Sequence, residues 1–473
     1  MRKSSLYFSI ALLLALAATS AAADWPTYRG SNTRRGNIDS QPGPASAKVL
    51  WVHHSKDDFF ASLSAREGTV YATGLGGIGD FNVYALVTDP ASTKRAVRIA
   101  GSPLIKQPVL SSPSIAGDYL IFGDGMHLNS GAVLRCLTLD GFPVWQLTVP
   151  GTLVHMEGSP VIDGNRVYIG GGHAGVMCID ADALELEGKS MTRAQALVLL
   201  KARWADMLAD YERRKKVDEF AFPPLHDALP KPQPKVIWQV GKNAWHVDAP
   251  LALEGERLLV SSSLLDAEKQ GKRSLLCLKT SDGSLLWETP MPSNPWGGAS
   301  IVGDRAYIGC STVGMYPQLI AAARGDVMAI NLKDGSVAWK KPVKGGVVSP
   351  IAVTSNLAIF TATDGKVRAF DVNTGLLKWL YDGGAPFYAG AAVAGDFVYT
   401  GDLRGIVHAI HLANGTGAWK LDLAADPTVK LSQGGKIYGS PIVHGGRLFV
   451  ATCNLERDGT TKHQMAIVCI GEK

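Results

Sequence analysis

A glycine followed four residues later by a tryptophan recurs along most of the chain, and this repeat constrains the fold more than any other feature. Around each pair run short segments rich in β-branched and aromatic residues, separated by turns such as Asn-Thr-Gly and Lys-Asp-Gly. Alternating segments of this kind, divided by turns that favour a positive φ, predict four antiparallel strands per repeat. The pairs are Gly141/Trp145, Gly283/Trp287, Gly335/Trp339, Gly375/Trp379 and Gly415/Trp419.

The spacing of the repeat predicts the number of sheets. Trp339, Trp379 and Trp419 are 40 residues apart, and shorter versions of the motif end at Trp51 and Trp238. Counting these units predicts an all-β, eight-bladed β-propeller of four-stranded antiparallel blades over residues 48–473. The residues after Trp419 supply three strands, so we expect the strand at Trp51 to complete the last blade and close the ring. The tryptophans themselves are expected to be structural rings wedged between blades.

Residues 183–235 interrupt the third blade. Thr192 and Gln195 have the spacing of a helix-capping box, and apolar residues then follow at helical spacing, which predicts a helix from about 193 to 217. A proline-rich return leads back into the repeat. Two interpretations remain open, a helix packed on the side or face of the propeller and an arm or lid that docks a partner.

The N-terminus has the pattern of a signal peptide. Arg2 and Lys3 precede an apolar run, and Ala21 and Ala23 give the small-x-small pattern of a cleavage site, so we expect residues 1–23 to be removed. An N-terminal arm, residues 24–47, then leads into the propeller. No later run is apolar and long enough to span a bilayer, and no cysteine near the cleavage point can accept a lipid. We therefore expect an exported protein, periplasmic or secreted, without a transmembrane segment or lipid anchor.

The net charge and the positions of the cysteines bear on whether the protein binds nucleic acid and whether it forms disulfides. The formal net charge of +5 falls to +3 without Arg2 and Lys3, and the basic residues are scattered, which argues against nucleic acid as a partner. Six cysteines are present, and four of them occupy one repeated strand position where other repeats place alanine. A position that accepts either residue is small and buried, so these are predicted to be packing thiols. The sequence assigns no disulfide pairing.

Candidate functional residues lie where the innermost strand of each blade begins. Aligning the repeats places these positions around one mouth of the central channel. The third and fourth repeats each carry a histidine two residues before a carboxylate, His155 with Glu157 and His246 with Asp248. Converging side chains of these types could bind a divalent metal or act as catalytic acid and base. Alternatively, each carboxylate accepts hydrogen bonds from a nearby histidine or backbone group.

Most other positions at this mouth are aromatic or aliphatic. Exposed together, such rings would form an apolar patch suited to a peptide, a glycan or a planar cofactor, whereas buried rings would belong to the core. His127 and His173 lie in loops that should open on the same side, and no role is assigned to them. The candidates for binding a ligand or cofactor are Phe60, Trp245, Asn294, Trp296, Tyr388 and Tyr438.

The repeats that end in Asp-Gly or Thr-Gly, three further residues and tryptophan resemble the pyrroloquinoline-quinone-like (PQQ-like) repeat superfamily of eight-bladed propellers. The segment Asp24–Asn37, "DWPTYRGSNTRRGN", looks like the arm that opens many exported members. The resemblance spans nearly the whole chain outside the insertion and implies one of two functional classes. Fold alone does not choose between them.

The first class is the quinoprotein alcohol dehydrogenases, in which PQQ and calcium sit in the central funnel. The resemblance implies an adjacent Cys-Cys disulfide, an Asp base, and Glu, Asn and Asp calcium ligands. This chain has no adjacent cysteines and no haem-attachment motif. The second class is non-catalytic propellers, such as the lipoprotein of the outer-membrane barrel assembly machinery, which bind other proteins.

Together these patterns favour an exported, monomeric, non-catalytic propeller that binds a protein or small ligand at its funnel mouth. The alternative is a PQQ- and calcium-dependent dehydrogenase that oxidises an alcohol or a sugar at the same mouth.

Overall fold

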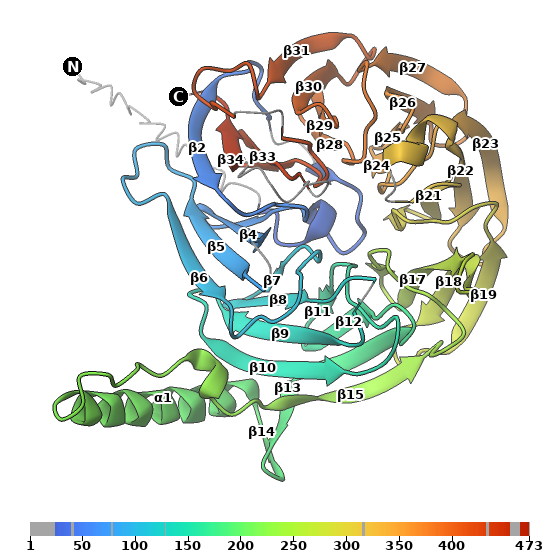
Figure 1. Ribbon diagram of the computed structural model, residues 1–473. Helices are drawn as coiled ribbons and strands as arrows, with labels where there is room; N and C mark the ends of the chain where they lie inside the picture. Colours follow the sequence, from blue (N-terminus) through green and yellow to red (C-terminus); the bar gives the residue numbers. More distant parts are fainter. Residues whose placement is uncertain are drawn as a thin grey trace, which may run out of the picture.

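The structure is a computed structural model that describes residues 24–38, 42–76, 79–127, 129–314, 317–431, 435–454 and 464–472. The predicted signal peptide, residues 1–23, lies outside the described residues. Eight antiparallel sheets formed by the described residues are arranged as blades around a central axis (Figure 1). The predicted eight-bladed propeller is therefore confirmed.

The first four blades follow one another along the chain. Blade 1 contains β3 (Ser64–Arg66), β4 (Thr69–Leu75), β5 (Phe81–Val87) and β6 (Ala96–Gly101), and blade 2 contains β7 (Ser114–Ala116), β8 (Tyr119–Gly123), β9 (Ala132–Thr138) and β10 (Pro143–Val149). Blade 3 contains β11 (Val161–Asp163), β12 (Arg166–Gly170), β13 (Val176–Leu186) and β15 (Gln233–Val240), with β14 (Lys189–Met191) paired to the end of β13. Blade 4 contains β16 (Ala252–Glu254), β17 (Arg257–Leu265), β18 (Gln270–Lys279) and β19 (Leu285–Pro290).

The remaining blades close the ring. Blade 5 contains β20 (Ala299–Val302), β21 (Arg305–Ser311), β22 (Arg324–Asn331) and β23 (Val337–Lys344), and blade 6 contains β24 (Ala352–Val353), β25 (Leu357–Thr361), β26 (Lys366–Asp371) and β27 (Leu377–Asp382). Blade 7 contains β28 (Ala392–Ala394), β29 (Phe397–Gly401), β30 (Ile406–His411) and β31 (Gly417–Asp422), with β1 (Asn37–Ile38) parallel to β28. Blade 8 combines β32 (Ile442–His444), β33 (Arg447–Ala451) and β34 (Met465–Ile470) with the N-terminal strand β2 (Val49–Ser55), which places Trp51 opposite Cys469 as the repeat requires.

The tryptophan of the Gly-Trp repeat connects one blade to the next through a hydrogen bond and a ring contact. The indole Nε1 of Trp379 in blade 6 donates a 2.9 Å hydrogen bond to the carbonyl of Leu412 in blade 7. The same ring lies over Gly415, where a Cβ would meet it at 2.7 Å and where φ is 74°. Glycine is thus required twice, by the turn and by the neighbouring ring. Equivalent indole hydrogen bonds to the next blade are made by Trp51, Trp238, Trp287 and Trp339, and Trp419 instead bonds the carbonyl of Pro44 in the N-terminal arm.

The hydrophobic core lies between the blades. Ile359 and Val367 of blade 6, for example, pack in one buried cluster with Val393 and Val398 of blade 7. The four cysteines at the repeated strand position, Cys136, Cys178, Cys277 and Cys469, are buried, in keeping with the predicted packing thiols.

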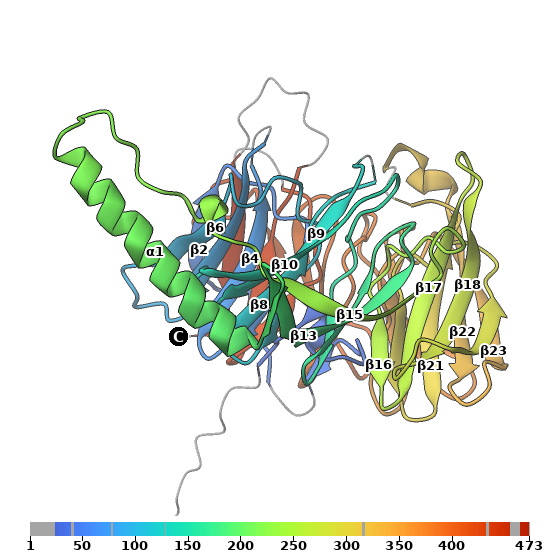
Figure 2. The same ribbon diagram turned by 90° about the horizontal axis from the view of Figure 1, so that it is seen from below.

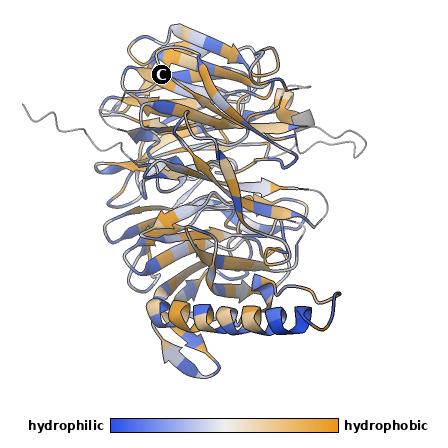
Figure 3. Cartoon of the chain, turned by 90° about the vertical axis from the view of Figure 1, so that its left-hand side faces the viewer, coloured by the Kyte–Doolittle hydropathy of each residue, from blue (hydrophilic) through white to orange (hydrophobic). Residues whose placement is uncertain are grey.

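The insertion in blade 3 contains the helix α1 (Arg193–Lys215), which Thr192 and Gln195 begin with the expected capping box. It runs along the outside of the ring beside β10 and β13 (Figures 1 and 2). Only Ala196 and Leu200 of the helix are buried. Its last turn is hydrophilic (Figure 3), whereas Phe220 and Phe222 just beyond it are exposed. The helix therefore packs on the propeller's side along one narrow stripe, which confirms the predicted helical insertion.

The N-terminal arm runs from blade to blade across the inner strands of the propeller. Its backbone hydrogen-bonds Ala65, Ile115, Leu253, Ile301, Val353 and Val393, one residue on the innermost strand of each of six blades. Arg34, fully buried, donates to the carbonyls of Leu251, Ser159 and Pro160. The 3₁₀ turn Tyr28–Gly30 of this arm lies near the centre of the ring in Figure 1. The arm therefore binds the inner strands and the residues just before them, and the mouth residues precede the same strands in the chain.

Two other short 3₁₀ helices, His226–Ala228 and Pro317–Ala322, lie in loops. Among the helices of the described residues, none has the length and apolarity that crossing a membrane requires.

Candidate functional site

The two histidine-carboxylate pairs meet at one carboxylate. The Nε2 of His155 lies 2.7 Å from Oδ1 of Asp248, and the Nε2 of His246 lies 2.9 Å from its Oδ2. Both imidazoles are fully buried. His155 precedes the inner strand β11 of blade 3, and His246 precedes β16 of blade 4, so Asp248 bridges neighbouring blades. The structure thus brings together His155, Glu157, His246 and Asp248, whereas the sequence related each histidine only to the carboxylate of its own blade.

Local backbone geometry explains how the rings fit. The segment around Val247 pairs with Gly172, through two 3.0 Å hydrogen bonds, at the start of the loop that follows β12. Gly172 has a φ of 56°, and a Cβ there would lie 3.0 Å from the ring of His155. A glycine is required at this position because both the conformation and the space exclude a side chain.

The carboxylates of the cluster differ in their electrostatic environment. Burial, together with repulsion from Asp248, raises the pKa of Glu157 to about 7. Burial also disfavours the charged form of Asp248, but the imidazoles of His155 and His246 outweigh it and hold the pKa of Asp248 far below its usual range. Burial opposes protonation of His155, yet Asp248 raises its pKa overall. Asp248 is consequently the fixed negative charge of the cluster.

A third histidine joins the cluster from blade 2. His127 follows β8, and its ring centroid lies 5.6 Å from that of His155 and 5.7 Å from that of His246. Its backbone N–H donates a 3.0 Å hydrogen bond to Glu157, and its Nε2 lies 3.6 Å from a carboxylate oxygen of Glu268. One ring nitrogen from each histidine lies within 4.8 Å of the other two. The sequence held a signal for His127, its place in a loop that opens toward the mouth, but spacing alone assigned it no role.

Three of the aromatic candidates form a second group on the other side of the ring. Phe60, Tyr388 and Tyr438 precede the inner strands of blades 1, 7 and 8. The ring of Tyr438 lies 5.2 Å from that of Phe60 and 5.5 Å from that of Tyr388, centroid to centroid. Phe60 and Tyr438 are half-buried, whereas Tyr388 is buried and donates to the carbonyl of Gly314. The mouth is thus divided between aromatic rings on blades 7, 8 and 1 and histidines and carboxylates on blades 2 to 4.

The other three candidates have separate surroundings. Trp296 is half-buried and lies against Gly314, which connects it to the aromatic side through Tyr388. Trp245 is buried in the core of blades 3 and 4. Asn294 uses its amide within the chain, since its oxygen accepts from the backbone N–H of Leu264 and its nitrogen donates to the carbonyl of the same residue, both at 2.9 Å.

These contacts do not fit the quinone-and-calcium arrangement that the resemblance implied. Calcium takes six to eight oxygen ligands. The amide oxygen of Asn294 already accepts a backbone hydrogen bond, and both oxygens of Asp248 face imidazoles. No step of a quinone-dependent reaction is therefore assigned to these residues.

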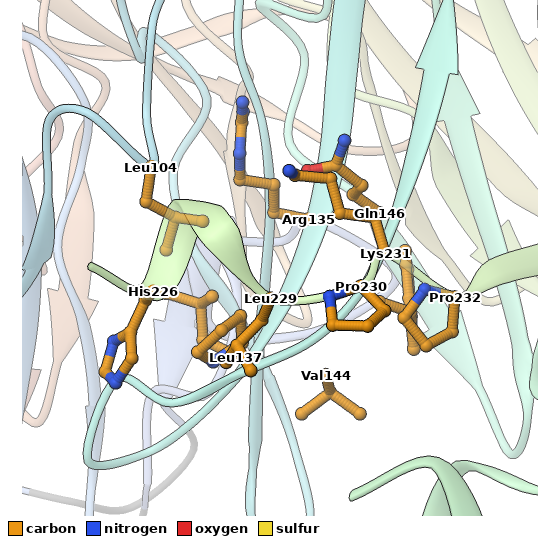
Figure 4. A pocket seen from close by; sticks show the side chains of 12 residues that line it. Leu104, Arg135, Leu137, Val144, Gln146, His226, Leu229, Pro230, Lys231 and Pro232 are labelled. Carbon is orange, nitrogen blue, oxygen red and sulfur yellow. The ribbon is translucent and has the colours of Figure 1, made fainter. Parts of the chain in front are cut away.

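A small pocket lies away from the mouth, where the proline-rich return of the insertion crosses blade 2. Figure 4 shows Pro230, Lys231 and Pro232 of the return beside Val144 and Gln146 of β10. Lys106 of blade 2 pairs with Asp227 at 3.1 Å. These contacts attach the return segment to the side of the propeller.

Comparison with known proteins places this architecture in a family. A family profile described as outer membrane protein assembly factor BamB matches residues 42–199 and 312–456, more than half of the chain. The BamB protein of Burkholderia pseudomallei (strain K96243) is 26% identical over 238 residues, which cover 48% of this chain and 57% of that protein. The chain thus matches little more than half the length of this relative.

Two solved structures share the fold at low sequence identity. BamB from Moraxella catarrhalis superposes with a TM-score of 0.55 at 11% identity, covering 89% of this chain and 97% of that one. The quinohemoprotein alcohol dehydrogenase of Comamonas testosteroni superposes with a TM-score of 0.59 at 13% identity, covering 95% of this chain and 81% of that one. Both functional classes therefore share this architecture, and the sequence match decides the family. The chain belongs to the family of the outer membrane protein assembly factor BamB.

Proposed function

We propose that this protein is an exported, non-catalytic propeller that binds a protein partner at its funnel mouth and serves in the assembly of outer-membrane proteins. Its mature form comprises residues 24–473, with the arm over 24–47, the propeller over 48–473 and the insertion over 183–235. The signal-peptide pattern of residues 1–23 supports a periplasmic location. Membership of a family named for outer-membrane protein assembly supports the kind of partner.

The observation that carries the proposal is the contiguous aromatic group at the mouth. Phe60 and Tyr438 contact each other from neighbouring blades and remain half-buried, and Trp296 is half-buried as well. Half-exposed tyrosine, phenylalanine and tryptophan rings are characteristic of the centres of protein interfaces, because each offers a large rigid contact area. A partner's apolar side chains would complete the burial of these rings.

Site-specific photo-crosslinking tests the proposal. A benzophenone amino acid replaces Tyr438 in the protein expressed in a Gram-negative host, and a matched control replaces Leu380, an exposed residue of β27 in blade 6. We expect the Tyr438 position to crosslink an outer-membrane protein or a component of its assembly machinery, and Phe60→Ala to weaken that crosslink. Equal crosslinking from Leu380, or none from Tyr438, would contradict a partner site at the mouth.

A calorimetric titration with PQQ in calcium distinguishes the enzymatic alternative. We expect no binding. Binding that is lost on combining Glu157→Ala with Asp248→Ala would replace the scaffold proposal with a quinone-dependent oxidoreductase.

A further inference from the structure

The histidine cluster has the residue types of a metal site, and several of its ring nitrogens have no hydrogen-bond partner in the described residues. His127, His155 and His246 come from blades 2, 3 and 4, and each offers one nitrogen within 4.8 Å of the other two. Asp248 supplies a carboxylate 2.7 Å from His155 and 2.9 Å from His246. Three imidazoles and one carboxylate are a donor set that zinc-class ions take.

The ring nitrogens lack the hydrogen-bond partners that buried imidazoles normally have. Within the described part of the chain, the Nδ1 of His155 and both nitrogens of His246 have no hydrogen bond, although both rings are fully buried. A buried polar atom without a partner costs free energy, so native structures rarely leave several together. A bound cation supplies the missing partner for a nitrogen lone pair.

The contact between His246 and Asp248 strengthens this argument. The Nε2 of His246 lies 2.9 Å from Oδ2 of Asp248, yet its direction does not suit an N–H···O hydrogen bond. A nitrogen lone pair and a carboxylate oxygen at that separation repel each other unless a positive charge lies between or beside them. A metal ion beside the two atoms could coordinate both the nitrogen lone pair and the carboxylate oxygen.

The surroundings favour a cation and give it a way in. Glu157 accepts a hydrogen bond from the His127 backbone, and Glu268 lies 3.6 Å from the His127 ring, so two further carboxylates face the cluster. The side chains of His127 and Glu268 are 33% and 38% exposed, which opens the cluster to solvent on that side. Four-coordinate zinc with bonds of about 2.0–2.1 Å holds its ligands about 3.3 Å apart. Binding would draw the three nitrogens, which lie within 4.8 Å of one another, to that spacing.

We propose that His127, His155 and His246, together with Asp248, bind one divalent transition-metal ion of the zinc class at the propeller mouth. The ion cross-links blades 2, 3 and 4 through the loop after β8 and the segments that precede β11 and β16. Calcium is excluded from the proposal because the donors are mainly nitrogen, and calcium binds oxygen ligands. The inference is independent of the partner-binding proposal, since it concerns the opposite side of the mouth from the aromatic group.

Metal titration of the purified full-length protein tests the site. After treatment with a chelator, the protein is titrated with Zn²⁺ by calorimetry and with Co²⁺ by visible absorption. We expect one ion per chain and a Co²⁺ spectrum of tetrahedral nitrogen and oxygen coordination. Failure to bind either ion, or binding of Ca²⁺ in preference to Zn²⁺, would overturn the proposal.

Single-histidine variants identify the ligands. We expect His127→Ala and His155→Ala each to weaken Zn²⁺ affinity by at least about 100-fold, because ligand loss should exceed the 10- to 100-fold effect of losing an outer contact. The matched control is His411→Ala on blade 7, whose ring lies against Phe397 instead. His127 lies in a half-exposed loop, so its variant remains informative if His155→Ala fails to fold. Unchanged affinity in the folded His127→Ala protein, or equal loss in His411→Ala, would refute the assignment.

Discussion

Blade 7 contains a buried histidine-carboxylate pair that contrasts with the cluster on blades 2 to 4. His408 and Asp402 are both fully buried, with the His408 Nε2 3.1 Å from Oδ2 of Asp402. The Nδ1 of His408 lies 3.0 Å from the hydroxyl of Tyr381, and the other oxygen of Asp402 accepts from the backbone of Arg404 and Ile406. Every polar atom of this pair has a partner within the chain. The same residue types therefore build a self-sufficient structural unit in one blade and an incomplete site in another.

The comparison extends to other repeats. Asp124 in blade 2 pairs with Arg135, and Asp364 in blade 6 pairs with Arg368, each just after the second strand, as Asp402 does. An aspartate after the second strand with a cationic or imidazole partner on the third strand is thus a recurring structural feature. The cluster of His155, His246 and Asp248 lies elsewhere, before the first strand, where the repeat itself does not require it. A polar group that the fold does not need is a better candidate for function than one that recurs with the repeat.

The largest effect should follow from breaking the blade 7 pair. Asp402→Ala removes the partner of His408 and leaves two backbone N–H groups without an acceptor, so we expect the free energy of unfolding to fall by about 3–5 kcal/mol. Denaturant unfolding followed by tryptophan fluorescence measures this loss. Zn²⁺ affinity, measured on the folded fraction, should be unchanged. A variant with weakened zinc binding would remove the distinction between the two regions.

Zinc should raise the free energy of unfolding by binding at the cluster on blades 2 to 4 and at no other place. At free Zn²⁺ about 100 times its Kd, a single site adds about 2.7 kcal/mol to the free energy of unfolding. Thermal melts with and without chelator should therefore differ for the wild type and coincide for His127→Ala. Because Asp402→Ala retains all four ligands, its melting temperature should still rise with zinc. A zinc shift that persists in His127→Ala would mean that the ion stabilises some other place.

Tyr381→Phe makes the blade 7 histidine resemble those of the cluster. Loss of the hydroxyl leaves the Nδ1 of His408 without its partner, and we expect a cost of about 1–2 kcal/mol in the free energy of unfolding. The change should not create a zinc site, since only one imidazole is present there among the described contacts. Thermal melts of the double variant Tyr381→Phe, His127→Ala with and without zinc check this. A melting temperature that rises with zinc in the double variant would show that a single unpartnered imidazole nitrogen is enough to bind the ion.

The sequence predicted the fold because its signal is local and repeated. Each Gly-Trp pair lies within one turn and one strand, and the missing strand of blade 8 followed from counting. It predicted His155, Glu157, His246 and Asp248 as candidates because each pair lies within three residues. It did not predict that Asp248 bridges both histidines or that His127 completes the set, because those contacts join three blades and depend on side-chain direction. The sequence also did not predict the hydrogen bonds of the Asn294 amide with Leu264, because they join two blades.

Trp145 shows where the repeat itself is broken. Its Nε1 has no hydrogen-bond acceptor in the described residues, because the turn that would supply one in blade 3 is replaced by the insertion. Its ring packs instead in a cluster that includes Leu184 and Ala196 of that insertion. The insertion therefore substitutes apolar contact for the inter-blade hydrogen bond that Trp379 makes with Leu412.

This difference predicts the smallest of the effects. Trp379→Phe removes a hydrogen bond and leaves the half-buried carbonyl of Leu412 without this donor, whereas Trp145→Phe removes none. Both lose similar apolar area, so we expect Trp379→Phe to lower the free energy of unfolding by about 1 kcal/mol more than Trp145→Phe. Parallel denaturant titrations of the two variants measure the difference. Equal losses would show that the blades are joined by ring packing alone, and the contrast between satisfied and unsatisfied polar groups would then apply only to the histidines.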